Sequence, residues 1–381
     1  MPALTCRLRF PSTPARPPVS ARAASVRVLL AAPSLRILGG QSRQAALLLD
    51  CLQGERGLQI TFVPHDPRLP GPLGWLQRIK YVRTVLTSIA YWSLLLARVP
   101  RHDIIHIFSA SYISYLLAAV PPLLVGRLYR KTVILNYRSG EAEDHLERWP
   151  RTTLSTMRRA HAIVVSSGYL VEVFRRFGLY ARVIPDVVEL GRFHFRERRP
   201  PRPVFLTSRL LEPLYNVECV LRAFALIQER LQDARLIVAG DGSRRRRLEA
   251  LTRELGLRHV DFVGPVPFER MPALYDAADI YLQAPDLDNT PASLLECFAS
   301  GLPVVTSDAG GIPFLIRHER EGLLVPRDDH RALAAAALRV LDDPDLASRL
   351  ASQALRVCQQ YTCPRVRAGW LALYADRREA S

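Results

Sequence analysis

Cysteine is sparse in this sequence, and no two cysteines are closely paired. None of the six forms a CxxC pair, and they lie at Cys6, Cys51, Cys219, Cys297, Cys358 and Cys363. This spacing argues against a structural zinc site and against the disulfide framework of a secreted domain. We therefore expect buried thiols in a protein of a reducing compartment. No heptad register and no repeat of about 20–50 residues is visible, which excludes coiled coils and solenoids.

Lysine is almost absent, because Lys80 and Lys131 are the only two among 52 basic residues. The formal net charge of +16 is therefore carried by arginine, and it is unevenly placed. Residues 1–200 hold 29 Lys and Arg against 12 Asp and Glu, a balance of +17, whereas residues 201–381 hold 23 against 24, a balance of −1. Such a field suits an anionic partner, such as nucleic acid, a membrane surface or an acidic substrate.

The length of 381 residues, with 49% hydrophobic and 23% charged residues, predicts two folded domains and excludes a mainly disordered chain. Residues 1–25 contain no acid and no apolar run of signal-peptide length, so we expect a disordered tail there, with a transit peptide as the alternative. Residues 104–126 are nearly uncharged, but a Pro-Pro pair lies inside them, and a buried strand followed by a buried helix fits better than a membrane span. Residues 78–99 predict a helix that either packs on the core or docks on a membrane surface.

Short apolar runs alternate with helical patterns along the whole chain. In the first half the runs are VRVLLAA, QITFVP, DIIHIF, TVILNY, AIVVS and ARVIP, and after a charged, proline-rich stretch the alternation resumes at VFLTS. This pattern predicts an α/β fold of two doubly wound, Rossmann-like domains at 26–191 and 204–360 that face a cleft. We expect a linker at 192–203 and a C-terminal helix in 361–381 that packs back on the first domain.

Two carboxylates lie eight positions apart in DNTPASLLECFASG, at residues 288–301. Pro291 suits the first turn of a helix, so Asp288 would lie in the loop before it. Glu296 would lie within the helix among apolar neighbours, where a carboxylate needs a partner. Taken alone, these residues are also compatible with a loop aspartate and one exposed glutamate.

The motifs around this stretch resemble the donor site of retaining, nucleotide-sugar-dependent glycosyltransferases of family 4, which have the GT-B fold. The resemblance runs through VFLTSRLLEPLYNVECVLRAF, RLIVAGDGSRRRRLE, VDFVGPVPFERMPALYDAADIYLQ, DNTPASLLECFASGLPVVTSDAGGIPFLI and EGLLVPRDD. These motifs occur in one order over residues 203–350, so the resemblance is specific. It implies that the C-terminal domain binds a nucleotide-sugar donor and that the N-terminal domain binds the acceptor.

The resemblance implies donor contacts for the acids and for the loop between them. Glu296 would accept hydrogen bonds from the donor ribose hydroxyls, a charge-assisted arrangement. Asp288 stands where the family usually has a glutamate near the donor sugar. Asn289 and Thr290 would offer backbone amides at a helix start.

Further positions match the family's phosphate and base contacts. Arg209 would clamp the pyrophosphate, because a guanidinium makes bidentate contacts and keeps its charge. The family usually has a lysine a few residues later, and Tyr215 is the nearest match here, although a phenol cannot replace a phosphate counter-ion. Two loops, which contain Gly240 and Val266, would line the nucleotide base. A third loop, which contains Gly39 and Gly40, would let the backbone approach a phosphate.

Arg138, after the strand TVILNY, stands where the family often has a histidine close to the donor sugar. An arginine cannot act as a general base, but it can hold an anion or offset charge on the departing diphosphate. We therefore expect Arg138, Asp288 and Arg209 to be the catalytic residues.

These inferences predict a cytoplasmic, peripheral membrane enzyme. It would move a sugar from a nucleoside diphosphate-sugar to a glycan or lipid-linked acceptor, with retention of configuration, at an anionic membrane surface on the inner face. We expect no cofactor and no metal; Asp286 and Asp288 are the one acidic pair that could hold a nucleotide-bound cation.

Three alternatives remain at this point. One is a GT-B epimerase or phosphorylase, of which the phosphorylase is disfavoured because no lysine follows residue 131. A second is a catalytically silent subunit that binds a nucleotide-sugar. The third, a nucleic-acid-binding protein, is not expected, because the basic residues are not interleaved with aromatics in a known motif.

Overall fold

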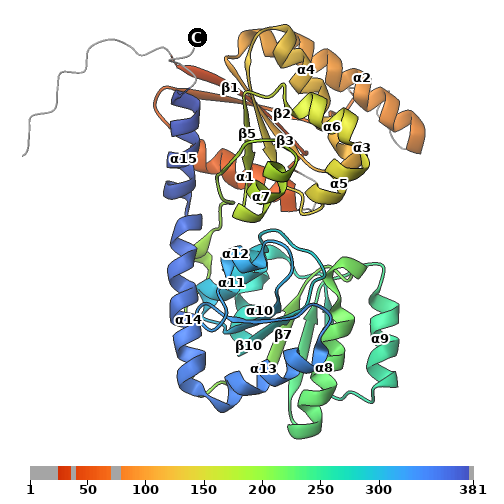
Figure 1. Ribbon diagram of the computed structural model, residues 1–381, viewed down its shortest axis with the longest axis vertical. Helices are drawn as coiled ribbons and strands as arrows, with labels where there is room; N and C mark the ends of the chain where they lie inside the picture. Colours follow the sequence, from red (N-terminus) through yellow and green to blue (C-terminus); the bar gives the residue numbers. More distant parts are fainter. Residues whose placement is uncertain (1–24, 36–39, 70–78, 377–381) are drawn as a thin grey trace, which may run out of the picture.

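The structure is a computed structural model, and it describes residues 25–35, 40–69 and 79–376. Two lobes lie one above the other in Figure 1, and each is built on a parallel sheet of six strands. The expected α/β architecture of two doubly wound domains is confirmed, and it is the GT-B arrangement. Gly39 and Cys6 lie outside the described residues.

The N-terminal sheet has the strand order β2-β1-β3-β4-β5-β6. Its strands are β1 Val26–Ala32, β2 Leu58–Pro64, β3 Ile104–Ser109, β4 Thr132–Tyr137, β5 Ala162–Val165 and β6 Ala181–Val183. The helices of this lobe are α1 Gly40–Leu52, α2 Lys80–Arg98, α3 Tyr112–Ser114, α4 Val120–Leu128, α5 Ala142–Arg148, α6 Pro150–Met157 and α7 Gly168–Arg176, with a π-helical turn at Tyr115–Ala119. Residues 104–126 thus form a strand and then a helical stretch, as expected.

The C-terminal sheet has the order β12-β11-β10-β7-β8-β9. Its strands are β7 Val204–Ser208, β8 Arg235–Ala239, β9 Val260–Gly264, β10 Ile280–Gln283, β11 Val304–Ser307 and β12 Leu323–Val325. The helices are α8 Val217–Arg230, α9 Arg245–Glu254, α10 Met271–Ala277, α11 Ala292–Ser300, α12 Ile312–Leu315, α13 His330–Asp342 and α14 Pro344–Cys358. Apolar clusters cover both faces of this sheet, as a parallel sheet requires.

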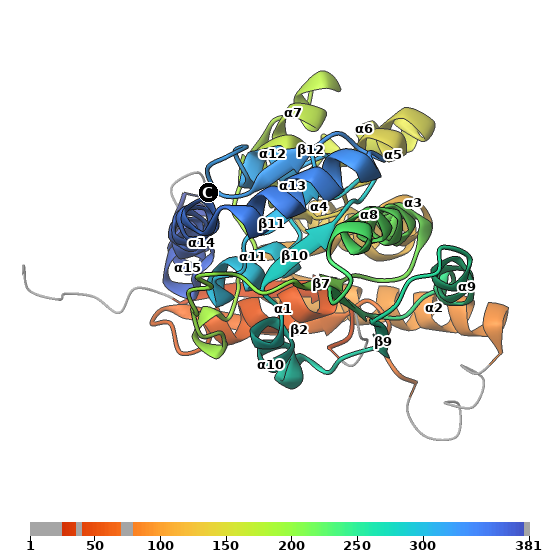
Figure 2. The ribbon, with the colours of Figure 1, turned by 90° about the horizontal axis from the view of Figure 1, so that it is seen from below.

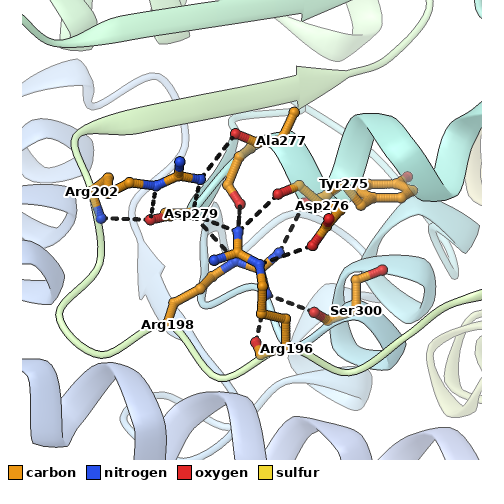
Figure 3. A network of polar contacts seen from close by, with 9 residues as sticks. Arg196, Arg198, Arg202, Tyr275, Asp276, Ala277, Asp279 and Ser300 are labelled. Atoms are coloured by element: carbon orange, nitrogen blue, oxygen red, sulfur yellow. Dashed lines mark hydrogen bonds and ion pairs between the residues drawn. The ribbon is translucent and has the colours of Figure 1, made fainter.

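Residues 192–203 are fixed to the C-terminal lobe by a cluster of arginines (Figure 3). Arg196 donates to the Asp279 carboxylate at 2.7 Å and Arg202 donates at 2.9 Å. Arg198 is itself buried and donates to the carbonyl of Ala278 at 2.9 Å. The buried charge of Asp279 is therefore compensated by arginines, and the chain between the sheets is held at the start of β10.

The last helix, α15 Cys363–Ala375, leaves the C-terminal lobe and lies against the N-terminal sheet (Figure 1). Trp370 and Tyr374 are buried there in an apolar cluster with α1 and with one face of the sheet. A disulfide between Cys51 and Cys363 joins α1 to α15. The expectation of thiols throughout was therefore wrong for this pair, because residues 312 positions apart are brought together by the return of the chain.

The other cysteines of the described residues behave as expected. Cys219, Cys297 and Cys358 are free and buried. Burial raises the pKa of the Cys219 thiol to about 12, so it stays protonated at neutral pH.

Helix α2 presents apolar side chains to solvent. Tyr81 is 79% exposed, and Val85 and Ile89 are each 58% exposed. The far end of the helix is packed, since Tyr91 is buried and donates to the carbonyl of Ala118 at 3.0 Å. By length and composition residues 81–101 could cross a membrane, and only 17% of that window is buried. The N-terminal end of α2 projects from the lobe at the right of Figure 1.

Candidate functional site

A cavity of about 360 Å³ lies between the two lobes, at the carboxyl ends of the strands. The N-terminal lobe lines it with residues from the start of α1, the end of β4 and the segment after β6. The C-terminal lobe contributes the segment after β7 and the loop before α11. Seven predicted site residues line it, namely Gly40, Arg138, Arg209, Tyr215, Asp288, Asn289 and Thr290.

Arg209 follows β7, and its backbone is fixed by the loop after β8. Its amide donates to the carbonyl of Ala239 at 3.1 Å. Gly240 has a φ of +130°, and a Cβ there would lie 2.0 Å from the carbonyl oxygen of Arg209. Only glycine permits this close approach. Gly240, expected beside the nucleotide base, therefore holds Arg209 in place and is absent from the cavity lining.

The Arg209 side chain is only 10% exposed, and it meets three polar or aromatic groups. Its guanidinium donates to the Asp288 carboxylate and, at 3.1 Å, to Ser293 Oγ. It also lies 4.2 Å from the ring centroid of Tyr215. Burial by itself would lower the pKa of Arg209, but the nearby Asp288 charge outweighs it and the pKa is raised. The cavity wall therefore carries a permanent cation.

The loop before α11 is held by both lobes. Two glycines pack under it, since a Cβ at Gly310 would lie 2.2 Å from the Asp288 carbonyl oxygen and one at Gly311 would lie 2.1 Å from that of Asn289. The Asn289 side chain donates to Ser166 Oγ at 2.8 Å and accepts from Ser167.

One expected ligand contact is already engaged within the protein. The backbone amide of Asn289 donates to the Asp288 carboxylate at 2.8 Å. A ligand that binds this amide would therefore have to displace the Asp288 carboxylate from it.

Arg138 enters the cavity from the end of β4 and pairs with the Asp186 carboxylate. Its Nε donates to Asn136 Oδ1 at 2.9 Å. Burial lowers the pKa of Arg138 to about 9, which leaves the guanidinium charged at neutral pH. Asp186 was not predicted as a site residue, although an acid just after a strand of a parallel sheet is placed at the ligand-binding edge.

Glu296 lies on α11 and is 8% exposed. The carboxylate has the partner that its apolar surroundings require, because the Tyr275 hydroxyl donates to it at 2.7 Å. Burial raises the pKa of Glu296, although the bond from Tyr275 opposes the shift. Glu296 does not line the 360 Å³ cavity.

Arg43 of α1 crosses from the N-terminal lobe toward this region. Its guanidinium carbon lies 3.0 Å from the ring centroid of Phe268. This pair could not be predicted from the sequence, because the contact depends on how the two lobes face each other.

Gly40 and Val266, two further predicted residues, lie in elements that support the site. Gly40 begins α1, and Gln44 in that helix exchanges two hydrogen bonds of 3.0 Å with the backbone of Val187, which fixes α1 against the segment after β6. Val266 packs against an apolar cluster of the C-terminal lobe.

The two acids considered for a cation do not converge. Asp286 accepts from Asn216 at 3.1 Å, whereas Asp288 faces Arg209. Within the described part of the chain, His, Cys, Asp and Glu side chains form no group of three or more that could hold a metal. The site roles assigned from the sequence stay predictions.

A second cavity of about 640 Å³ adjoins the first and shares Gly140, Glu141, Leu214 and Leu287 with it. Tyr112 and Tyr169 of the N-terminal lobe also line it. The site therefore has two connected compartments, one beside Arg209 and one bounded mainly by α5.

Comparison with known sequences agrees with this geometry. Residues 192–357 match the family of glycosyl transferases group 1. The C-terminal lobe is thus similar in sequence to group 1 glycosyltransferases. An alpha-1,4-N-acetyl-D-galactosaminyltransferase of Campylobacter jejuni, named for an acceptor on undecaprenol diphosphate, is 32% identical over 167 residues, 43% of this chain and 46% of that protein.

A second relative is a GDP-mannose-dependent phosphatidylinositol monomannoside mannosyltransferase of Mycobacterium tuberculosis. It is 28% identical over 174 residues, 44% of this chain and 45% of that enzyme. The match thus spans about half the length of these relatives. Among solved structures, HepE of Anabaena with UDP and glucose superposes with a TM-score of 0.70 at 16% identity, covering 92% of this chain and all of that one. This likeness confirms the GT-B fold over both lobes.

Proposed function

We propose that the chain is a retaining glycosyltransferase that takes its sugar from a nucleoside diphosphate-sugar. The observation that carries the proposal is the buried, permanently charged Arg209 in the wall of the interlobe cavity. A departing diphosphate gains one negative charge when its bond to the sugar breaks, and a preorganised guanidinium in a site shielded from water stabilises that charge strongly. The first turn of α11, which begins at Ala292 beside Asp288, adds its positive end.

Retention is proposed because residues 288–301 resemble the donor signature of retaining enzymes. Arg138 on the opposite wall is cationic and cannot deprotonate an acceptor hydroxyl. Glu141 also lines the cavity and would be the base of an inverting reaction. The anomer of the first product therefore distinguishes the two outcomes.

The test is release of nucleoside diphosphate from a panel of UDP-, GDP-, ADP- and dTDP-sugars, followed by NMR of the product anomer. We expect turnover of one donor with its anomeric configuration kept. Arg209→Ala should abolish turnover, while the exposed Arg246→Ala serves as the matched control. An inverted product that depends on Glu141 would overturn retention, and binding without turnover of any donor would favour the silent-subunit alternative.

We further propose that the acceptor is membrane-linked and that α2 rests on the membrane surface. Both relatives named above act on lipid-linked sugars according to their names. The exposed stripe of Tyr81, Val85 and Ile89 lies in the half of the chain with a balance of +17. Apolar insertion together with attraction of arginines to anionic lipid is the usual basis of such docking.

Co-sedimentation with phosphatidylcholine vesicles, with and without phosphatidylglycerol, tests this surface. The wild-type chain should bind the anionic vesicles and dissociate at high salt. Replacing Tyr81, Val85 and Ile89 by serine should abolish binding, whereas Tyr180→Ser with Val263→Ser, also exposed, should not. Binding that persists in the triple variant would exclude α2, and no binding at low salt would favour a soluble acceptor.

A further inference from the structure

A continuous chain of polar contacts leads from the C-terminal helix α15 to the interlobe cavity. Tyr374 Oη lies 2.7 Å from His106 Nδ1, and His106 Nε2 lies 3.0 Å from Asn136 Nδ2. Asn136 Oδ1 accepts from Arg138 Nε at 2.9 Å. Arg138 is the member of this chain that lines the cavity.

The chemistry of these groups fixes the direction of every hydrogen bond. A guanidinium can only donate, so the amide oxygen of Asn136 must face Arg138. The amide nitrogen then faces His106 and can only donate, so His106 Nε2 must accept. The single proton of a neutral imidazole is therefore on Nδ1, where it is donated to the Tyr374 hydroxyl.

The surroundings hold this arrangement in one state. His106 and Asn136 are fully buried, and Tyr374 is 2% exposed. The ring of Trp370 is stacked on His106 at 4.2 Å between centroids. Burial, with the Arg138 charge as a smaller contribution, lowers the pKa of His106 well below its usual value. The imidazole therefore stays neutral, as the hydrogen-bond directions require.

We propose that Tyr374, His106 and Asn136 position the Arg138 guanidinium in the cavity, so that α15 supports the site without lining it. Asp186 holds Arg138 from one side and Asn136 holds it from the other. An arginine fixed at two points loses less conformational freedom when it meets a ligand. An effect of this positioning on the reaction rate rests on the proposed transfer reaction. The claim that these residues position Arg138, called the positional claim below, does not.

The positional claim is tested by NMR of protein labelled with ¹⁵N at histidine. The His106 signal, assigned by its loss in His106→Gln, should report a neutral ring protonated on Nδ1 from pH 5.5 to pH 8. Asn136→Leu, which removes the donor to Nε2, should change this signal to a mixture of tautomers. A ring protonated on Nε2 in the wild type, or one that titrates in this range, would overturn the chain.

A double-mutant cycle tests the catalytic consequence with the donor that wild-type enzyme turns over. His106→Leu should lower kcat about 10-fold with the donor KM nearly unchanged, and it should have no further effect in Arg138→Ala. His106→Gln keeps an acceptor for Asn136 and a donor for Tyr374, so it should restore most of the rate. Trp370→Phe, the packing control, should leave kcat within about twofold of wild type. Equal losses from His106→Leu in both backgrounds would overturn positioning through Arg138.

The NMR test and the double-mutant cycle can fail independently of each other. If no sugar nucleotide is turned over by the wild-type chain, the proposed function fails and the NMR result alone decides the hydrogen-bonded chain. If the wild type is active and the cycle is additive, the proposed function stands and the positioning role is wrong. A collapse of His106→Leu is recognised by its thermal unfolding, and Tyr374→Phe, which removes one hydroxyl only, then replaces it in the cycle.

Discussion

Asp288 neutralises the buried guanidinium of Arg209 inside the interlobe cavity. A diphosphate that binds Arg209 has to compete with this carboxylate. The two residues therefore have opposite expected effects on nucleotide affinity, although both are assigned to the donor site.

Asp288→Asn should tighten binding of the free nucleoside diphosphate while it lowers turnover. The amide keeps the shape of the loop but removes the competing charge, so affinity should rise about 3- to 10-fold. Calorimetric titration and the transfer rate measure the two effects. Asp286→Asn, whose carboxylate bonds Asn216 instead, is the control. Weaker nucleotide binding in Asp288→Asn would mean that this carboxylate does not oppose the diphosphate.

Arg209→Ala should cost more nucleotide affinity than Tyr215→Phe. Hydrogen bonds to a charged group are worth about 1.5–3 kcal/mol, whereas the phenol ring that packs on Arg209 is kept in the second variant. Calorimetry with the nucleoside diphosphate compares them. Equal losses would place the pyrophosphate elsewhere.

Glu296→Gln should weaken nucleotide binding by about 1–3 kcal/mol and leave the fold intact. The exposed Glu229→Gln is the matched control. Because burial raises the pKa of Glu296, the carboxylate is lost on acidification at a higher pH than an exposed glutamate would be. Wild-type affinity should therefore fall as pH falls toward that pKa, and Glu296→Gln should not show this fall. Unchanged affinity in Glu296→Gln would remove it from the ribose contact.

Arg138→Ala should lose about 10²–10³-fold in transfer rate, the scale of a lost electrostatic contact to a transition state. Nucleotide affinity is measured alongside, to separate binding from chemistry. A surface arginine would give almost no change, and a wild-type rate in this variant would take Arg138 out of the mechanism. Transfer gained only in Arg138→His, from an inactive wild type, would instead support a silent subunit.

The fold should lose stability in mild acid because of His145. Burial lowers the pKa of this histidine to about 4. Below the unfolded value near 6.5, the unfolded chain therefore binds a proton that the folded chain does not, and stability present at neutral pH is lost as pH falls. The loss at pH 5 is about 2 kcal/mol from this residue. Urea unfolding of wild type and His145→Gln at pH 7 and pH 5 measures it, and an identical pH dependence in both would contradict the assignment.

The sheets and seven residues of the cavity lining could be predicted from the sequence, because both follow from local patterns. Apolar runs between helical segments give parallel strands, and the carboxyl ends of such strands gather in one place. Arg138, Arg209 and Asp288 each follow such a strand. It was therefore predictable that these three side chains would lie near one another. The fixed order of motifs in residues 203–350 made the resemblance of the C-terminal lobe to a donor-binding domain specific.

The missed features depend on contacts between segments that are distant in the chain. Arg43 meets Phe268 only because the lobes face each other, and Cys51 meets Cys363 only because α15 returns to the first lobe. The support that Gly240 gives to the Arg209 backbone could not be predicted either, since spacing alone does not distinguish a glycine that touches a ligand from one that supports the neighbouring backbone. The spacing of apolar residues predicts which face of a helix or strand is buried, but it does not predict which segment packs against that face.

The central claim is that the cavity beside Arg209 binds a nucleoside diphosphate, and nucleotide-dependent unfolding tests it most directly. The wild-type chain is unfolded in urea with UDP, GDP, ADP and dTDP, each over a range of concentrations. We predict that one of them stabilises the fold by about 2.7 kcal/mol at 100 times its dissociation constant, and that Arg209→Ala loses this gain while Arg246→Ala keeps it. Stabilisation by none of the four, or an equal gain in Arg209→Ala, would contradict the account.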